Sequence, residues 1–248
     1  MAFRSRSIAR TFYFPGFPTG VKWLLISNVA VFLAGFFAQL AQLDGPLRYL
    51  ALTPVAVVKY FAVWQLATYM FLHASFGHII WNMLALWMFG AMLEPIWGTR
   101  RFLQFYFFCG IGAGLCVVLL NYLLPWGNPN VATLGSSGGI FGILMACGML
   151  FPDTKILYSF LIPIQMKWLV LIYGAVAFLS SFQVNTGVSA FAHLGGLLFG
   201  YIFLKSPRMQ FDLVGPVRRQ YQDYRLRRAK KKFQVYLRKQ SGKGPTIH

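Results

Sequence analysis

Charged residues are scarce in this chain of 248 residues: they make up 11% of it, whereas an average soluble domain has about 25%. Acidic residues are the rarest, with five Asp and Glu in all. Hydrophobic residues reach 57%, and the mean hydropathy is +0.57. So few polar groups cannot cover a water-soluble globule, which excludes a soluble enzyme, a disordered chain and a secreted disulfide scaffold. The composition favours a polytopic α-helical membrane protein.

Cysteine is also rare, and the three cysteines, Cys109, Cys116 and Cys147, all lie in apolar stretches. Their spacing fits neither a disulfide framework nor a zinc site. We interpret them as packing residues and expect no cofactor.

What the chain does have is a series of apolar runs, each near the length of about 20 residues that crosses a bilayer. The first run is longer than the roughly 7–15 residues of a signal-peptide core, and we interpret it as an uncleaved anchor. The predicted spans are Trp23–Leu43, His78–Ile96, Phe102–Leu124, Ser137–Phe151, Ile164–Phe182 and Val188–Leu204. We expect an N-terminal segment (1–22), a six-helix core (23–206) with a long first loop, and a basic tail (207–248).

The cations are distributed unequally between the predicted loops. Six spans put both termini on one side, and placing that side in the cytoplasm leaves only Arg48 and Lys59 of the 23 Lys and Arg outside. This satisfies the positive-inside rule and explains most of the net charge of +18 without nucleic acid. The eleven cations between Arg218 and Lys243 indicate a juxtamembrane tail near anionic lipid, with a partner-binding or nucleic-acid-binding role as the alternative.

Polar residues of three predicted spans share one depth in the membrane. His78, Asn82, Ser137 and His193 all fall within roughly 10 Å of the predicted outer interface at the rise of an α-helix. Ionisable groups inside a membrane are costly, so each is a candidate functional residue. His78 and Asn82 share a helix face and suit a developing oxyanion, although such a pair can equally form interhelical hydrogen bonds.

The segment Gly135-Ser136-Ser137-Gly138 follows a loop and opens a helix. A serine there has free backbone N–H groups and the positive end of the helix dipole beside it, which stabilises negative charge near its hydroxyl. The alternative is an N-cap serine followed by glycines that serve helix packing.

Small residues recur every four positions on two predicted spans, at Gly138, Gly142 and Ala146 and at Ala192, Gly196 and Gly200. Such stripes let two helix backbones approach closely, which could bring a serine hydroxyl and a histidine nitrogen within about 3 Å.

No carboxylate is expected near these side chains, because Glu94 lies about 18 Å deeper than Asn82. A Ser–His dyad therefore fits better than a triad. His73, His78 and His193 could form an open zinc site, but the sequence has no His-Glu-x-x-His motif, so we expect no metal.

In combination, these motifs resemble the rhomboid family of intramembrane serine proteases. The resemblance rests on five motifs between Leu43 and Leu204: Trp64-Gln65-Leu66-Ala67-Thr68, His73-x4-His78-x3-Asn82, Glu94-x3-Gly98 followed by Arg101, Gly135-Ser136-Ser137-Gly138, and Ala192-His193-x-x-Gly196-x3-Gly200. Their order and their shared depth make the combination specific.

The resemblance implies roles for individual residues. Ser137 would be the nucleophile, His193 the general base, and His78, Asn82 and the Ser137 backbone N–H the oxyanion hole. His73, Gly135, Gly138, Gly196 and Trp64 would support the site. The family's usual arginine after the tryptophan is Gln65 here, which puts in doubt only the hydrogen bonding of the first loop.

The implied protein is a serine endopeptidase of the six-helix form typical of bacteria. It would cleave transmembrane segments of single-pass or polytopic membrane proteins near the outer interface, in the inner (cell) membrane. Two alternatives are a catalytically silent rhomboid-like protein that binds membrane clients and a transporter or channel. The presence of both Ser137 and His193 favours activity over the first. The lack of an inverted repeat and of midplane carboxylates disfavours the second.

Overall fold

The computed structural model describes residues 16–43, 45–158, 162–182 and 187–206. The chain divides into two compact units, Met1–Lys205 and Ser206–His248. The predicted basic tail and most of the predicted segment 1–22 lie outside the described residues.

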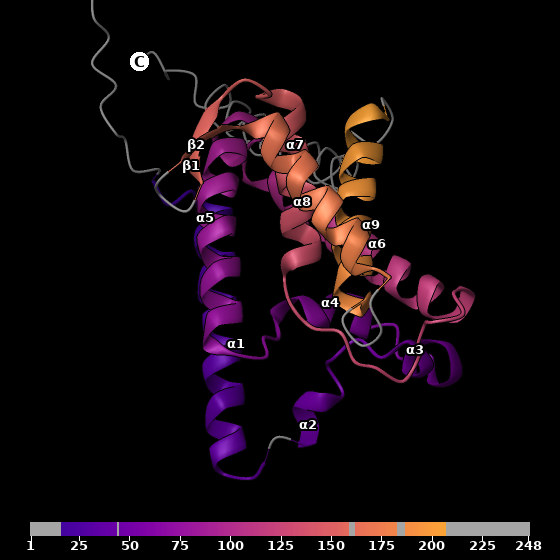
Figure 1. Cartoon of the computed structure of the whole chain (residues 1–248). Helices are drawn as coiled ribbons and strands as arrows, with labels where there is room; N and C mark the ends of the chain where they lie inside the picture. Colours follow the sequence, from indigo (N-terminus) through magenta and orange to yellow (C-terminus); the bar gives the residue numbers. More distant parts are fainter. Residues whose placement is uncertain (1–15, 44, 159–161, 183–186, 207–248) are drawn as a thin grey trace, which may run out of the picture. The chain divides into compact units, whose positions relative to one another are not determined.

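The first unit is mostly helical (Figure 1). Its six longer helices are α1 (Thr19–Leu40), α5 (Phe76–Trp97), α6 (Thr99–Leu123), α7 (Ser137–Leu150), α8 (Met166–Ser180) and α9 (Gly187–Lys205). Four short helical segments lie in the long first loop: α2 (Gly45–Arg48), α3 (Pro54–Tyr60), α4 (Gln65–Thr68) and the 3-10 helix η1 (Tyr69–Phe71). The predicted helical membrane fold with a long first loop is confirmed.

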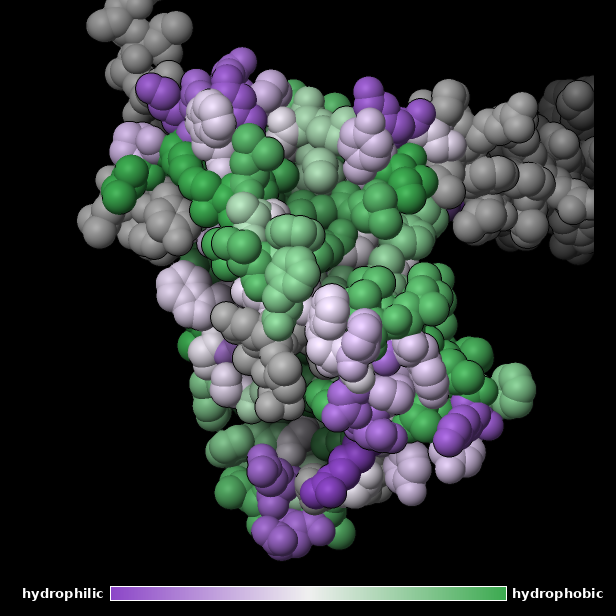
Figure 2. Space-filling view, turned by 45° about the vertical axis from the view of Figure 1, so that its right-hand side comes forward, coloured by the Kyte–Doolittle hydropathy of each residue, from purple (hydrophilic) through white to green (hydrophobic). Residues whose placement is uncertain are grey.

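Helices α1, α5 and α6 are long and apolar enough to cross a membrane, whereas α7, α8 and the stretch Ala190–Lys205 of α9 are shorter apolar helices. Figure 2 shows hydrophobic side chains, in green, over the middle of the visible face, between hydrophilic groups, in purple, above and below. The chain is an integral membrane protein, and the count of six spans stays a prediction.

A buried carboxylate sets where α1 begins. Glu94, near the end of α5, accepts hydrogen bonds from the backbone N–H groups of Gly20 at 2.7 Å and Val21 at 2.8 Å. It accepts a third from the Thr99 hydroxyl at 2.6 Å. Because the first turn of a helix leaves its N–H groups without intrahelical partners, this carboxylate stabilises a start at Thr19, four residues before the predicted one.

Helices α7 and α9 meet through the two predicted stripes of small residues. A Cβ atom on Gly196 would collide with the carbonyl oxygen of Gly138, and one on Gly200 would lie 3.0 Å from the Cα of Gly142. The two backbones are therefore in direct contact, and the predicted close approach is confirmed.

A β-hairpin that the sequence analysis did not predict links α7 to α8. Strand β1 (Lys155–Tyr158) pairs antiparallel with β2 (Ile162–Gln165), and Lys155 lies opposite Gln165. A short apolar run of this kind fits a strand and a buried helix equally well by its pattern. The predicted fifth span therefore begins at Ile164, which lies in β2, whereas α8 begins at Met166.

Candidate active site

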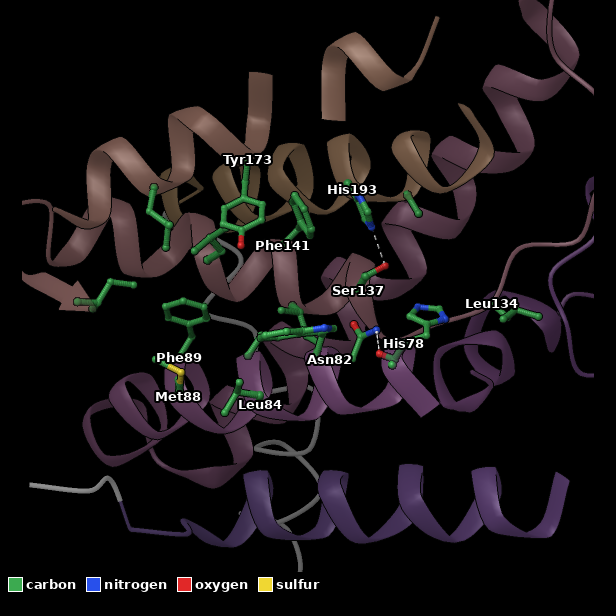
Figure 3. Close-up of a pocket in the computed structure, with 18 of the residues that line it drawn as sticks. His78, Asn82, Leu84, Met88, Phe89, Leu134, Ser137, Phe141, Tyr173 and His193 are labelled. Carbon is green, nitrogen blue, oxygen red and sulfur yellow. Dashed lines mark hydrogen bonds between the residues drawn. The ribbon is translucent and has the colours of Figure 1, made fainter. Parts of the chain in front are cut away.

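Ser137 and His193 come together where α7 and α9 cross. Ser137 is the first residue of α7, and its Oγ lies 3.0 Å from Nε2 of His193 in α9 (Figure 3). This is hydrogen-bond distance for a hydroxyl that donates to a ring nitrogen. The pairing depends on the small-residue contact between the two helices, because a wider separation would pull the two side chains apart.

An aromatic ring fixes the plane of the His193 imidazole. Phe141, one turn after Ser137 in α7, stacks on His193 with ring centroids 4.1 Å apart and an interplanar angle of 3°. Tyr173 of α8 contacts Phe141 edge-on at 6.1 Å. No sequence motif indicated a role for Phe141, although its i, i+4 spacing from Ser137 places both side chains on one helix face.

His78 and Asn82 of α5 lie across the cavity from α9 (Figure 3). The His78 Nδ1 atom accepts a hydrogen bond from the Ala74 N–H at 3.4 Å, which assigns the ring proton of neutral His78 to Nε2. The Asn82 side-chain amide donates to the His78 carbonyl oxygen at 2.9 Å. That bond uses one of the two amide hydrogens and leaves the other as a potential donor.

Gly135 makes room for the His78 ring. A Cβ atom on Gly135 would lie 2.8 Å from His78 Nε2, and the φ angle of Gly135 is +124°, a conformation that residues with side chains rarely adopt. Glycine is therefore required here, and it lets His78 approach the start of α7.

The first loop holds the segment that precedes Ser137. Leu52 and Thr133 form an isolated antiparallel bridge, with N···O distances of 3.0 and 2.8 Å. The Gly135 N–H donates to the Tyr69 carbonyl at 3.0 Å, and the buried Tyr69 hydroxyl donates to the Gly110 carbonyl at 2.7 Å. Tyr69 thereby ties the serine segment to α6, a role that no motif in the sequence revealed.

Ser136 forms a second Ser–His pair next to the first. Its Oγ lies 3.3 Å from Nε2 of His73, and Ser136 is fully buried. Burial lowers the pKa of His73 to about 4, assisted by the His78 ring with its centroid 5.0 Å away. Neither Ser136 nor His73 lines the cavity that Ser137 and His193 line. Ser136 is therefore enclosed by protein, with the part-buried His73 beside it, whereas Ser137 faces the cavity.

The cavity has a volume of about 720 Å³ and lies between α5, α7, α8 and α9. Four polar side chains gather at one end (Figure 3), whereas the remainder is mostly apolar and extends to Ile156 of β1. The polar end is formed by His78, Asn82, Ser137 and His193, and the apolar part includes Trp81, Met88, Phe89, Leu144, Leu169 and Tyr173.

Comparison with known proteins identifies the family of this chain. The family model described as the rhomboid domain matches residues 60–206, which include every residue of the cavity. The chain belongs to the rhomboid family.

Rhomboid relatives from distant organisms are similar to this chain. Rhomboid protein 1, mitochondrial, of Saccharomyces cerevisiae is 35% identical over 144 residues, covering 54% of this chain and 38% of that protein. Rhomboid protease GluP of Bacillus subtilis is 29% identical over 138 residues, covering 56% and 25%. Rhomboid-like protease 3 of Toxoplasma gondii is 28% identical over 199 residues, covering 75% and 69%. This chain thus spans less than half of the yeast and Bacillus relatives.

The tryptophan motif of this rhomboid lies in the first loop, away from the cavity. Trp64 is half exposed, and its Nε1 donates to the Tyr49 carbonyl at 3.0 Å. The buried Gln65 amide donates to the same carbonyl at 3.1 Å and accepts from the Thr53 N–H at 3.0 Å. Gln65, which replaces the family's usual arginine, therefore links two parts of the first loop by hydrogen bonds.

The two carboxylates among the described residues lie outside the cavity lining. Glu94 binds the start of α1, and Asp153 forms an exposed ion pair with Lys167 at 2.7 Å. Within the described part of the chain, no group of three or more His, Cys, Asp or Glu side chains is placed to hold a metal ion.

Proposed function

We propose that this rhomboid is an intramembrane serine endopeptidase that cleaves transmembrane segments with a Ser137–His193 dyad. The observation that carries the proposal is the 3.0 Å contact between Ser137 Oγ and His193 Nε2 at the polar end of a cavity. Relatives whose names describe them as rhomboid proteases support it.

The geometry supports acyl transfer. His193 Nε2 takes the proton of the Ser137 hydroxyl as Oγ attacks a peptide carbonyl carbon, and it then gives that proton to the leaving amine. In the second half-reaction His193 takes a proton from water and the hydroxide attacks the ester carbonyl carbon. The ester C–O bond then breaks, and His193 returns the proton to Ser137 Oγ. Phe141 stacked on the imidazole keeps Nε2 directed at Ser137 through both half-reactions.

Three donors surround the position of the oxyanion in this scheme. They are the Nε2–H of His78, the remaining amide hydrogen of Asn82 and the backbone N–H of Ser137 at the start of α7. The loss of one such donor typically costs about 3 kcal/mol of transition-state stabilisation.

The proposed substrates are membrane-spanning helices. An intact helix cannot present a peptide carbonyl to Ser137, because its backbone groups are bonded to one another, so the substrate must unwind near the polar end of the cavity. Glycine or proline in the substrate lowers the cost of unwinding. In this proposal the six-helix core (23–206) lies in a bacterial cell membrane with both termini cytoplasmic, and the polar end faces the outer side.

Cleavage of a model membrane substrate by the protein in lipid vesicles tests the proposal. We expect Ser137→Ala to abolish cleavage without changing the thermal unfolding midpoint. Ser136→Ala, a matched change at the neighbouring serine, should still cleave the substrate. Cleavage that survives in Ser137→Ala would refute the assigned nucleophile. Absence of cleavage by the wild type with several substrates would favour a silent, client-binding rhomboid-like protein.

A further inference from the structure

One end of the helix bundle concentrates positive charge. The hairpin lies at this end, where α5, α7 and α9 finish and α1, α6 and α8 begin (Figure 1). The Glu94 bonds to the start of α1 and the Phe105–Phe203 ring contact, with centroids 5.0 Å apart, join helix ends there. The described cations of this end are Lys22, Arg100, Arg101, Lys155, Lys167 and Lys205.

Four of these cations lie over aromatic rings. The ring belongs to the same helix as the cation in three pairs and to the adjoining helix in the fourth. Their charged groups are 5.2 to 6.0 Å from the ring centroids. The four pairs are Lys22–Trp23, Arg101–Trp97, Lys167–Trp168 and Lys205–Tyr201. We call these eight residues the cationic rim.

The rim surrounds the bundle instead of forming a patch on one side. Its pairs come from α1, from the junction of α5 and α6, from α8 and from α9. Helix α1 packs on α5 and α6, whereas α8 packs on α7 and α9. Three of the four rings point outward, because Trp23 is 60% exposed, Trp168 52% and Tyr201 46%.

Each rim pair borders the apolar surface of the helices. The neighbouring Ile26, Leu171 and Ile202, on α1, α8 and α9, are exposed hydrophobic side chains. Tryptophan and tyrosine favour the membrane–water interface, where the ring meets hydrocarbon and its polar edge meets the headgroups. A cation held over such a ring lies at the level of the lipid phosphates.

We propose that the cationic rim binds the phosphate groups of anionic phospholipids. A nucleic acid or a folded protein would touch one side of the bundle, whereas the cations of this end lie on helices all around it and match the plane of a headgroup layer. One of them, Lys167, is also paired with Asp153. Each cation near an anionic surface contributes about 1 kcal/mol, which corresponds to an affinity difference of about fivefold.

Spin-labelled lipids measure this binding directly. The full chain is reconstituted in phosphatidylcholine, and electron spin resonance gives the association constant of spin-labelled phosphatidylglycerol relative to spin-labelled phosphatidylcholine. We expect a constant above one that decreases with salt. Lys22→Gln/Lys205→Gln should lower it, by about fivefold at each altered site. Whatever residues 207–248 contribute is the same in both proteins, so the difference reports on the rim.

Two further variants separate the rim from simple net charge. Arg48→Gln/Lys59→Gln removes the same charge from α2 and α3 in the first loop and should leave the constant near the wild-type value. Trp23→Leu/Trp168→Leu keeps every charge and should lower the constant, because the ammonium groups lose their position over the rings. An unchanged constant in the Lys22→Gln/Lys205→Gln variant, or an equal decrease in the first-loop variant, would overturn the proposal. Thermal unfolding in detergent verifies that each variant is folded.

Discussion

The contact between α7 and α9 can be widened by a single methyl group at Gly196. In Gly196→Ala the new Cβ would overlap the Gly138 carbonyl oxygen and lie 3.0 Å from the Gly138 carbonyl carbon and 3.1 Å from the Phe141 Cβ. Two of these three atoms belong to backbone, which cannot rotate away as a side chain can. The helices must therefore separate by on the order of 1 Å, and such overpacking costs about 1–3 kcal/mol of stability.

The same displacement affects Ser137 and His193, since these residues lie next to the contact on the same two helices. A misplacement of about 1 Å lowers the rate of a positioned reaction by about 100-fold. We expect Gly196→Ala to react with a fluorophosphonate probe about 100-fold more slowly than the wild type while remaining folded. The assay follows labelling against time in detergent, with thermal unfolding measured on the same samples.

Gly174→Ala provides the matched control for this substitution. Gly174 lies in α8 and also faces α9, but among the described residues its new Cβ would meet only Leu197 Cδ1, at an ordinary contact distance of 3.4 Å. We expect wild-type labelling and up to about 1 kcal/mol of added stability from the better helix propensity of alanine. Wild-type labelling by Gly196→Ala, or equal slowing of both variants, would refute the argument that this contact sets the dyad geometry.

Three other predictions concern the surroundings of the site. Tyr69→Phe removes the hydroxyl bond to the Gly110 carbonyl and should cost about 1 kcal/mol of stability and several-fold in turnover. Thr99→Val, which loses a hydroxyl bond to Glu94, should lower stability but not turnover per folded molecule. Because the pKa of His73 is lowered to about 4 in the folded state, protonation of His73 favours the unfolded state. The free energy of unfolding should therefore decrease as the pH falls from about 6.5 towards 4. The thermal unfolding midpoint of His73→Gln should depend less on pH than that of the wild type. Glu94→Gln should lower the free energy of unfolding by about 2 kcal/mol, since one carboxylate serves three donors, and an unchanged unfolding midpoint would contradict this.

Much of the fold follows from patterns that lie within single segments. Long apolar runs predicted α5 and α6 to within three residues at each end. Local capping explains part of the remaining difference at α5, where the Ser75 hydroxyl accepts from the His78 N–H at 3.1 Å and starts the helix two residues before His78. The start of α1 was misplaced because Glu94, more than 70 residues away along the chain, determines it.

In the candidate site, too, the sequence predicted features that lie within one segment but not those that depend on packing between segments. The motifs named the polar side chains because polar groups at one depth of a membrane stand out against an apolar background. The stacking of Phe141 and the hydrogen bonds of Tyr69 could not be predicted from the sequence, since an aromatic residue in an apolar run resembles its hydrophobic neighbours. The family resemblance singled out Ser137 over Ser136, but the burial of Ser136 was not predicted, because it depends on how the first loop packs against the start of α7.

Mapping the residue modified by a fluorophosphonate probe tests the central claim most directly. Mass spectrometry of the labelled, folded wild type should place the phosphonate on Ser137, and labelling should disappear in His193→Ala. An adduct on Ser136 or elsewhere, or labelling that persists without His193, would contradict the assignment of Ser137 and His193 as nucleophile and base.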